Sequence, residues 1–222
     1  VTGVQTCALP IYAAALPTND SLTALQMAYS PKRGTDPQNF YTGIATSSKT
    51  FGFGFGYFGA LGDKKTTNGG FVGMGFKSNL EQYGLTYRNK DLTSNSMGDF
   101  DLSYLYTDTR ESIAYGGVLH SVNSSPQLDV GLGYIPDRSF NLEMNINTPP
   151  ANQISNGDYI LVAATNFALS PQITTHLQLS YHTKFSKTDP LFAINYWLTD
   201  VTNSFLQYTT PNIWSLGFSL IF

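Results

Sequence analysis

The sequence predicts an all-β chain that folds as an antiparallel, up-and-down transmembrane β-barrel of about fourteen strands. Apolar and polar residues alternate along most of the chain from about Ser21, which is the period of a strand. Charged residues make up 12% of the chain, about half of the roughly 25% typical of soluble domains, and aromatic residues make up 14%. The longest apolar run, Tyr159–Ala164, has about six residues, whereas a membrane helix needs roughly eighteen. A chain with these properties can cross a membrane only with strands whose apolar residues occupy alternate positions.

The first predicted strands lie between residues 22 and 57. Leu22–Tyr29 and Phe40–Thr46 are two candidates, and Phe40–Thr46 is the weakest strand of the whole set. Phe51–Tyr57 is the clearest, because aromatic residues occupy one face and glycine the other. If Phe40–Thr46 is instead a loop, the barrel has about twelve or thirteen strands.

The central and C-terminal strands are recognised by apolar residues at every second position. Their apolar faces, in chain order, are Val72, Met74 and Phe76; Tyr83, Leu85 and Tyr87; Phe100, Leu102, Tyr104 and Tyr106; Ile113, Tyr115 and Leu119; Leu128, Val130, Leu132 and Tyr134; Phe140, Leu142, Met144 and Ile146; Ile173, Leu177, Leu179 and Tyr181; Phe192, Ile194, Tyr196 and Leu198. Tyr159–Phe167 is apolar on both faces, and a weaker strand at Phe205–Thr209 leads into the last one. Most have roughly eight to ten residues, the length of a tilted membrane strand.

The last predicted strand, Ile213–Phe222, runs to the final residue of the sequence, whereas chain ends are usually frayed and polar. Its apolar face consists of Trp214, Leu216, Phe218, Leu220 and Phe222. This strand resembles the C-terminal strand of the Gram-negative outer-membrane β-barrel (porin-like) superfamily. In that superfamily the terminal aromatic residue is part of the signal that the barrel-assembly machinery recognises. The resemblance therefore implies a bacterial outer-membrane location, contact with outer-membrane lipid, and an assembly signal formed by these five residues.

The predicted connections alternate between short and long. The short ones are Thr46–Lys49, Lys77–Glu81, Thr107–Ser112, Pro136–Ser139, Leu169–Gln172 and Thr199–Asn203. The longer, turn-rich set is Ser30–Asn39, Gly62–Gly70, Asn89–Asp99, Ser121–Gln127, Thr148–Gly157 and Thr183–Pro190, with Thr210–Asn212 as its one short member. Short turns on one rim and long loops on the other are typical of outer-membrane barrels, whose short turns lie in the periplasm. An even strand count then places both barrel ends at the periplasmic rim.

The N-terminal segment is of a different kind. Val1–Ile11 resembles the translation of a sequencing adapter, so we exclude it from fold reasoning as an artefact; the alternative is a genuine short N-terminal leader. The only cysteine, Cys7, lies within it. Residues 12–20 are a stub or a signal-peptide remnant: Ala13–Ala15 is either the small-residue end of a signal peptide or an arbitrary apolar stretch. Residues 21–222 are expected to form the barrel.

The identity of the polar face favours a membrane barrel over a secreted soluble sandwich or lectin-like domain. The water-facing side of a soluble sheet should carry many Lys and Glu residues. Here the second face carries mostly Gly, Ser, Thr, Asn and Gln, which suits a confined lumen. Aromatic residues near both strand ends, such as Phe100 with Tyr106 or Tyr181 with Trp197, resemble the two interfacial aromatic girdles.

A set of titratable and amide side chains is expected to line the lumen, because they would be expensive in lipid. These residues are Arg88, Asp101, His120, Asp129, Asn141, Glu143, His176, Gln178 and His182. They could brace the barrel through ion pairs and hydrogen bonds, or line a conduction path and set its ion preference. Three lumenal carboxylates against one arginine predict a weak preference for cations.

The sequence does not favour a metal site, an enzyme or a nucleic-acid partner. His176 and His182 share a face but are separated by roughly 20 Å of strand, too far to share one metal ion, and we expect no metal and no cofactor. Ser180 and His182 lie roughly 6–7 Å apart along a strand, beyond hydrogen-bond reach, so we expect no enzyme. A net charge of −3 argues against a nucleic-acid partner.

These features predict a passive outer-membrane pore for small solutes. Barrels of about eight strands are filled by their own side chains and those of sixteen or more hold an aqueous channel, so about fourteen strands with a small polar lining should leave free space. Asn89–Asp99 and Thr148–Gly157 are expected to restrict the mouth. The alternative is a non-conducting structural or adhesive barrel that binds partners through its loops, and a third candidate is a barrel hydrolase that uses Ser180 and His182. The sequence specifies neither the solute nor the oligomeric state.

Overall fold

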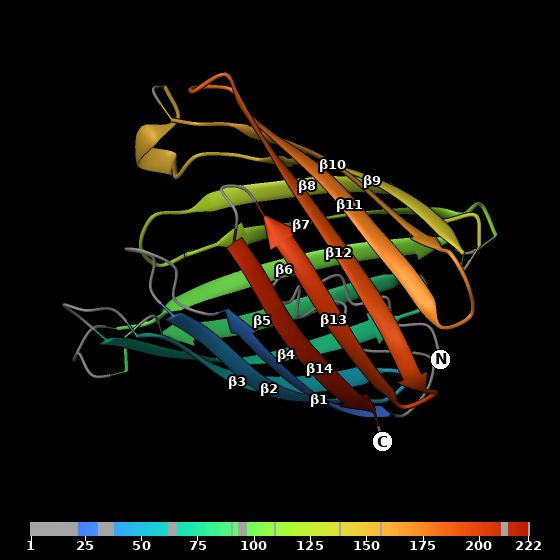
Figure 1. Ribbon diagram of the computed structural model, residues 1–222. Coiled ribbons are helices and arrows are strands. Elements are labelled where there is room, and N and C mark those ends of the chain that lie inside the picture. The colour runs from blue at the N-terminus through green and yellow to red at the C-terminus, as the bar shows by residue number, and fades with distance from the viewer. Residues whose placement is uncertain are drawn as a thin grey trace.

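The computed structural model is a closed antiparallel barrel of fourteen strands (Figure 1). It describes residues 22–30, 38–61, 66–89, 91–92, 97–108, 110–137, 139–155, 157–209 and 213–221. Each strand pairs with its neighbours in sequence, and β1 (Leu22–Ser30) pairs with β14 (Ile213–Ile221) to close the barrel. The predicted fold class and the count of fourteen are therefore confirmed, and the twelve-strand alternative is wrong.

The remaining strands match the alternating segments of the sequence. They are β2 (Gln38–Ser47), β3 (Phe51–Leu61), β4 (Thr66–Ser78), β5 (Glu81–Asn89), β6 (Asp99–Asp108), β7 (Ile113–His120), β8 (Gln127–Tyr134), β9 (Phe140–Asn147), β10 (Ile160–Ala168), β11 (Ile173–His182), β12 (Lys187–Thr199) and β13 (Thr202–Thr209). The weakest predicted strand is present as β2 and pairs along its whole length with β3. A short 3-10 helix, η2 (Ala151–Gln153), lies between β9 and β10. No helix in the described ranges is long and apolar enough to span a membrane.

The wall of the barrel has two chemically different faces. In β9, Phe140, Leu142, Met144 and Ile146 are exposed, while the polar residues between them are partly buried. Successive strand residues point to opposite sides, so the exposed apolar residues form the outside of the closed barrel. We call this side the outer face and the opposite side the inner face. Met144 is 63% exposed, whereas an apolar residue in the core of a soluble protein is buried.

The barrel has two rims, which differ less than predicted. We call the rim with the β2–β3, β4–β5 and β12–β13 connections the turn rim and the rim near η2 the loop rim; β14 ends at the turn rim (Figure 1). Gly62–Gly70 and Thr183–Pro190 were expected as long loops, but β4 begins at Thr66 and β12 at Lys187. The reason is that β3 and β11 extend far enough to pair with these residues: Leu61 lies opposite Thr66, and His182 lies opposite Lys187.

One predicted girdle residue is on the wrong face. Trp197 was expected on the outer face with Tyr181, but its neighbours Tyr196 and Leu198 are the exposed residues of that segment. Trp197 lies opposite Asn203, on the inner face, and the register irregularity of β12 comes only after it. Strict alternation from Ala193 therefore places Trp197 inside.

Candidate functional site: the inner face of the barrel

A chain of charged side chains crosses four neighbouring strands on the inner face near the loop rim. Arg88 of β5 contacts Asp101 of β6, with 3.1 Å between Nη2 and Oδ1. His120 of β7 lies between two carboxylates: its Nδ1 is 3.4 Å from Asp101 Oδ2, and its Nε2 is 3.1 Å from Asp129 Oδ2 of β8. We call these four residues the mouth cluster. Alternation predicted that they share a face, and the structure brings them into direct contact.

The mouth cluster also fixes the beginning of the β7–β8 connection. Asp101 Oδ1 accepts a hydrogen bond from the backbone N–H of Ser121 at 2.9 Å. The side chains of the cluster are only partly exposed, so their attraction is screened less than that of surface pairs. Asp101 therefore joins a cation, an imidazole and a loop amide at one point of the rim.

A second group of charges lies further along the loop rim. His182 Nδ1 contacts Asp158 Oδ2 at 2.5 Å, and His182 Nε2 is 3.4 Å from Asp189 Oδ2. Lys187 Nζ is 2.8 Å from Asp189 Oδ1. Burial raises the pKa of the Asp158 carboxyl, but hydrogen bonds from the Lys184 backbone N–H and from His182 outweigh it and hold that pKa below its usual range. Sequence reasoning missed both aspartates, and Asp189 could have been found only if β12 had been extended back to Lys187.

The geometry around Ser180 differs from that of a nucleophile and its base. Ser180 Oγ accepts a hydrogen bond from Gln178 Nε2 at 3.0 Å. Both ring nitrogens of His182 are directed at carboxylates rather than at Ser180. A serine nucleophile needs a base within hydrogen-bond reach, and His182 does not supply one in this arrangement.

An uncharged network joins β9, β10 and β11. His176 Nδ1 lies 2.8 Å from Asn166 Oδ1, and the Asn166 side-chain amide donates to Asn141 Oδ1 at 2.7 Å. His176 and Asn166 are buried, so this network satisfies polar groups that would otherwise be costly. The histidines at 120, 176 and 182 thus belong to separate networks, and within the described residues no group of three or more potential ligands could hold a metal ion.

Glu143 differs from the other inner carboxylates. It lies in the middle of β9, directly opposite Gly133 of β8 and Ala164 of β10. Within the described part of the chain, its carboxylate makes no hydrogen bond or ion pair. A Cβ built on Gly133 would make only ordinary contacts, the nearest with the Ala114 methyl group at 3.7 Å, so no aromatic ring lies over that glycine. Glu143 is therefore a carboxylate without a partner among the described residues, and it lies beside a glycine that no ring covers.

Aromatic rings cover the glycines of the inner face on the opposite side of the barrel. A Cβ on Gly56 would lie 2.5 Å from the ring of Phe71, and the rings of Phe58 and Tyr41 lie in the same way over Gly69 and Gly43. The free space expected over these glycines is filled, because neighbouring strands contribute large side chains to the same face. Sequence reasoning missed these rings, which lie at the inner positions of β2, β3 and β4.

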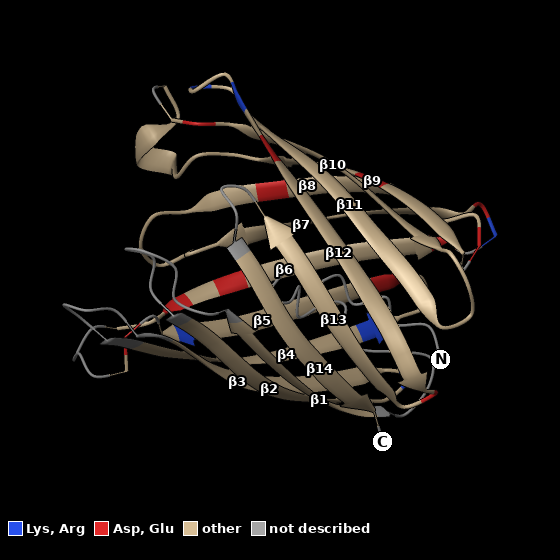
Figure 2. Ribbon diagram, viewed as in Figure 1, with Lys and Arg blue, Asp and Glu red and all other residues tan. Residues whose placement is uncertain are grey.

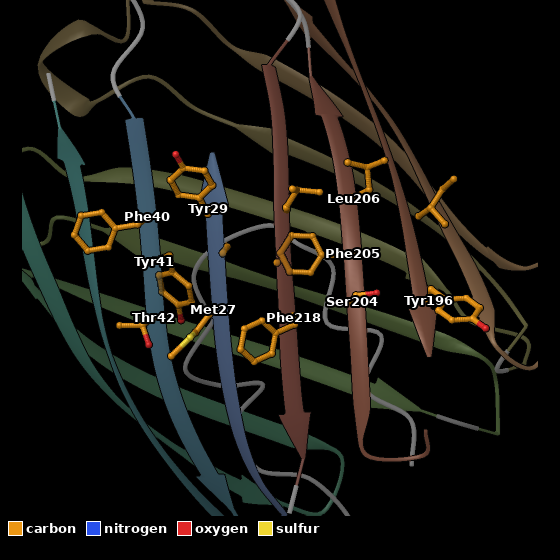
Figure 3. Close-up of a pocket in the computed structure, with 14 residues that line it drawn as sticks. Met27, Tyr29, Phe40, Tyr41, Thr42, Tyr196, Ser204, Phe205, Leu206 and Phe218 are labelled. Carbon is orange, nitrogen blue, oxygen red and sulfur yellow. The ribbon is translucent and has the colours of Figure 1, made fainter. Parts of the chain in front are cut away.

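The outer face is apolar where β14 meets its neighbours. Trp214, Leu216 and Phe218 of the predicted assembly signal are exposed, Leu220 is partly buried, and Phe222 lies outside the described residues. An apolar groove runs along this seam, and Figure 3 shows Met27 of β1 beside Phe218 of β14 within it. Such a surface suits contact with lipid acyl chains. That these residues form an assembly signal stays a prediction.

The closed barrel with an apolar outer face and a polar inner face defines a porin-like β-barrel fold. Solved structures of the same architecture include variants of the porin of Rhodopseudomonas blastica. One, a triple mutant, has a TM-score of 0.53 and 10% sequence identity, with 91% of this chain and 99% of that chain covered. Two other variants give TM-scores of 0.54 and 0.53 at 10% and 11% identity with the same coverage. Neither protein-family profiles nor curated protein sequences match the chain. At about 10% identity, this likeness shows a shared fold and nothing more.

Proposed function

We propose that the chain forms a passive pore of the bacterial outer membrane through which small solutes diffuse. The observation that carries this proposal is the closed fourteen-strand wall with exposed apolar residues outside and polar residues inside. A strand spacing of about 4.8 Å and a tilt of about 40° give a backbone diameter of roughly 28 Å. That width accommodates a layer of inner side chains and leaves room for a water-filled path.

The proposed environment follows from the outer face. Residues 21–222 would form the barrel in contact with outer-membrane lipid, and residues 1–11 would be no part of it. The exposed residues of β14 would be available to the barrel-assembly machinery. The likeness to a bacterial porin supports a membrane environment and small solutes, and it does not identify a particular solute.

The inner charges support a weak cation preference at neutral pH. Arg88 neutralises Asp101, and Lys187 neutralises Asp189. Glu143 makes no ion pair with the described residues, and Asp99 and Asp129 add further carboxylates, so we infer that the net field of the inner face is slightly negative. A lumen of this sign concentrates cations more than anions.

Recording from planar bilayers tests the pore. The refolded protein should produce stepwise single-channel currents, and a sample boiled before addition should produce none. In a KCl gradient, the reversal potential should have the cationic sign; a value of zero or of anionic sign would refute the cation preference. A correctly folded barrel without any conductance would favour the alternative, a structural or adhesive barrel that acts through its loops.

A further inference from the structure

We propose that the inner face favours small organic cations that carry an aromatic ring. This inference rests on the proposed pore function and names the solute class. Two features on opposite sides of the barrel point to it: a wall without charges that carries aromatic rings, and an unpaired carboxylate.

The first feature is a charge-free wall formed by the contiguous strands β13, β14, β1, β2 and β3. None of these strands contains Asp, Glu, Lys or Arg. Figure 2 shows their ribbons without red or blue, whereas Lys, Arg, Asp or Glu is present on β4, β5, β6, β8, β9 and β12. The inner face is therefore divided into a charged side and an uncharged side.

Aromatic rings line the inner side of this wall. Direct pairing places Phe205, Gly217, Ala28, Tyr41 and Phe58 in one row across five strands. Phe205 is 7% exposed, so it forms part of the base of this surface. Tyr41 and Phe58 are only partly buried, so part of each ring is exposed, and the ring of Phe205 covers Gly217.

Tyr41 is held in place by a second ring. It stacks on Phe71 of β4, with ring centroids 6.2 Å apart and planes 3° from parallel. Phe71 is itself 5% exposed and rests on Gly56. A fixed aromatic face attracts cations through its quadrupole and stacks with other rings.

The second feature is Glu143 on β9. In the barrel order, β9 is seven strands from β2 in either direction, so Glu143 lies across the interior from Tyr41. Glu143 is partly exposed, and the glycine directly opposite it adds no side chain, so we infer that a solute can reach the carboxylate. Among the described inner residues, Asp101 and Asp189 are paired with cations, Asp129 contacts His120, and Asp99 accepts a hydrogen bond from Ser124, whereas Glu143 has none of these contacts.

An organic cation that carries a ring gains most from the two features, because it pairs with the carboxylate and is both attracted by the rings and stacked on them. An inorganic cation gains little from the rings, a neutral aromatic solute gains little from the carboxylate, and an anion is repelled by it. An organic cation with a ring is attracted to either side of the path. Each aromatic contact should change its apparent affinity by roughly two- to fivefold.

Block of the KCl current of the refolded protein tests this inference. The probes are benzyltrimethylammonium, tetramethylammonium as a cation without a ring, and benzenesulfonate as an anion with a ring. Benzyltrimethylammonium should block at the lowest concentration. Glu143→Gln, which keeps the shape of the side chain, should weaken block by both cations several-fold and leave benzenesulfonate unchanged or stronger.

Matched variants of aromatic residues test the contribution of the rings on the charge-free wall. Phe58→Leu, on the inner face of β3, should weaken block by benzyltrimethylammonium roughly two- to fivefold relative to tetramethylammonium. Phe55→Leu, on the outer face of the same strand, should change neither. Equal block by benzyltrimethylammonium and benzenesulfonate would overturn the inference about the solute class. An unchanged pattern of block in Glu143→Gln would overturn it as well. In either case a measurable KCl conductance would still support the pore. Absence of KCl conductance would overturn both. If Phe58→Leu does not fold, Tyr41→Leu serves in its place.

Discussion

At the scale of single residues, two glycines on the inner face differ in what covers them. Gly56 lies beneath the ring of Phe71, whereas the side chain nearest to Gly133 is the small Ala114, at ordinary contact distance. Both are glycine in a strand, a residue that weakens strands unless something must approach closely. The difference lies in the partner strand and is invisible in the local sequence.

This contrast gives a matched pair of variants. Gly56→Ala forces Phe71 out of its place and brings the new methyl group within 3.1 Å of a backbone oxygen of Thr42, so we expect a loss of about 1–3 kcal/mol in the free energy of unfolding. Gly133→Ala should change it by less than about 0.5 kcal/mol, because the new methyl makes ordinary contacts. Urea titration in detergent micelles, followed by gel migration without boiling, measures both. Equal effects would contradict the packing described here.

Asp101 carries more contacts than any other residue of the mouth cluster. Asp101→Ala removes the partner of Arg88 and the hydrogen bond from Ser121, so we expect a loss of about 1–3 kcal/mol in the free energy of unfolding. Asp99→Ala is the control: its carboxylate accepts one hydrogen bond, from Ser124 Oγ at 2.5 Å, and its loss should cost about 0.5–1.5 kcal/mol. The same urea titration ranks the two variants, and a larger effect at residue 99 would speak against the cluster.

At the scale of elements, the β8–β9 turn is organised by one carboxylate. Asp137 Oδ1 accepts hydrogen bonds from the Ser139 hydroxyl and backbone N–H, each at 2.6 Å, and from the Phe140 backbone N–H at 3.0 Å. The Ser139 hydroxyl contributes most to lowering the pKa of Asp137, followed by the Ser139 N–H. The ionised carboxylate therefore holds the turn between two strands.

This turn predicts a pH dependence with a definite sign. Because the pKa is lower in the folded state, the stabilisation is complete above the unfolded pKa of about 3.9 and is lost as the pH falls through the folded pKa. Asp137→Ala should lower the urea midpoint at pH 7 and lose that difference at strongly acidic pH. Urea titrations of both proteins at several pH values measure this, and a difference that persists in strong acid would disprove the assignment.

Sequence alternation predicted the interiors of the strands better than their ends. Residues of β4 near Thr66 and of β12 near Pro190 have turn-like composition, yet they pair because β3 and β11 extend beside them. Alternation also placed Arg88, Asp101, His120 and Asp129 on one face, but it missed Asp189. It could not predict that Arg88 meets Asp101, or that His182 meets Asp158, because those contacts depend on register between strands.

At the scale of the whole molecule, the barrel combines an apolar outer face with an inner face of two unlike halves. The charge-free wall from β13 to β3 was present in the sequence, but its two parts are far apart along the chain and join only when β14 pairs with β1. Closure thus creates both the proposed path and its chemical asymmetry. We propose that the inner face lines this path.

Cysteine accessibility during single-channel recording tests that claim most directly. A chain without residues 1–11 has no cysteine, so Glu143→Cys and Met144→Cys each introduce a single thiol on the inner and outer face of β9. We predict that a cationic methanethiosulfonate reagent changes the conductance of Glu143→Cys and shifts its selectivity toward anions, while Met144→Cys is unaffected. A conductance that responds at neither position, or equally at both, would contradict the account.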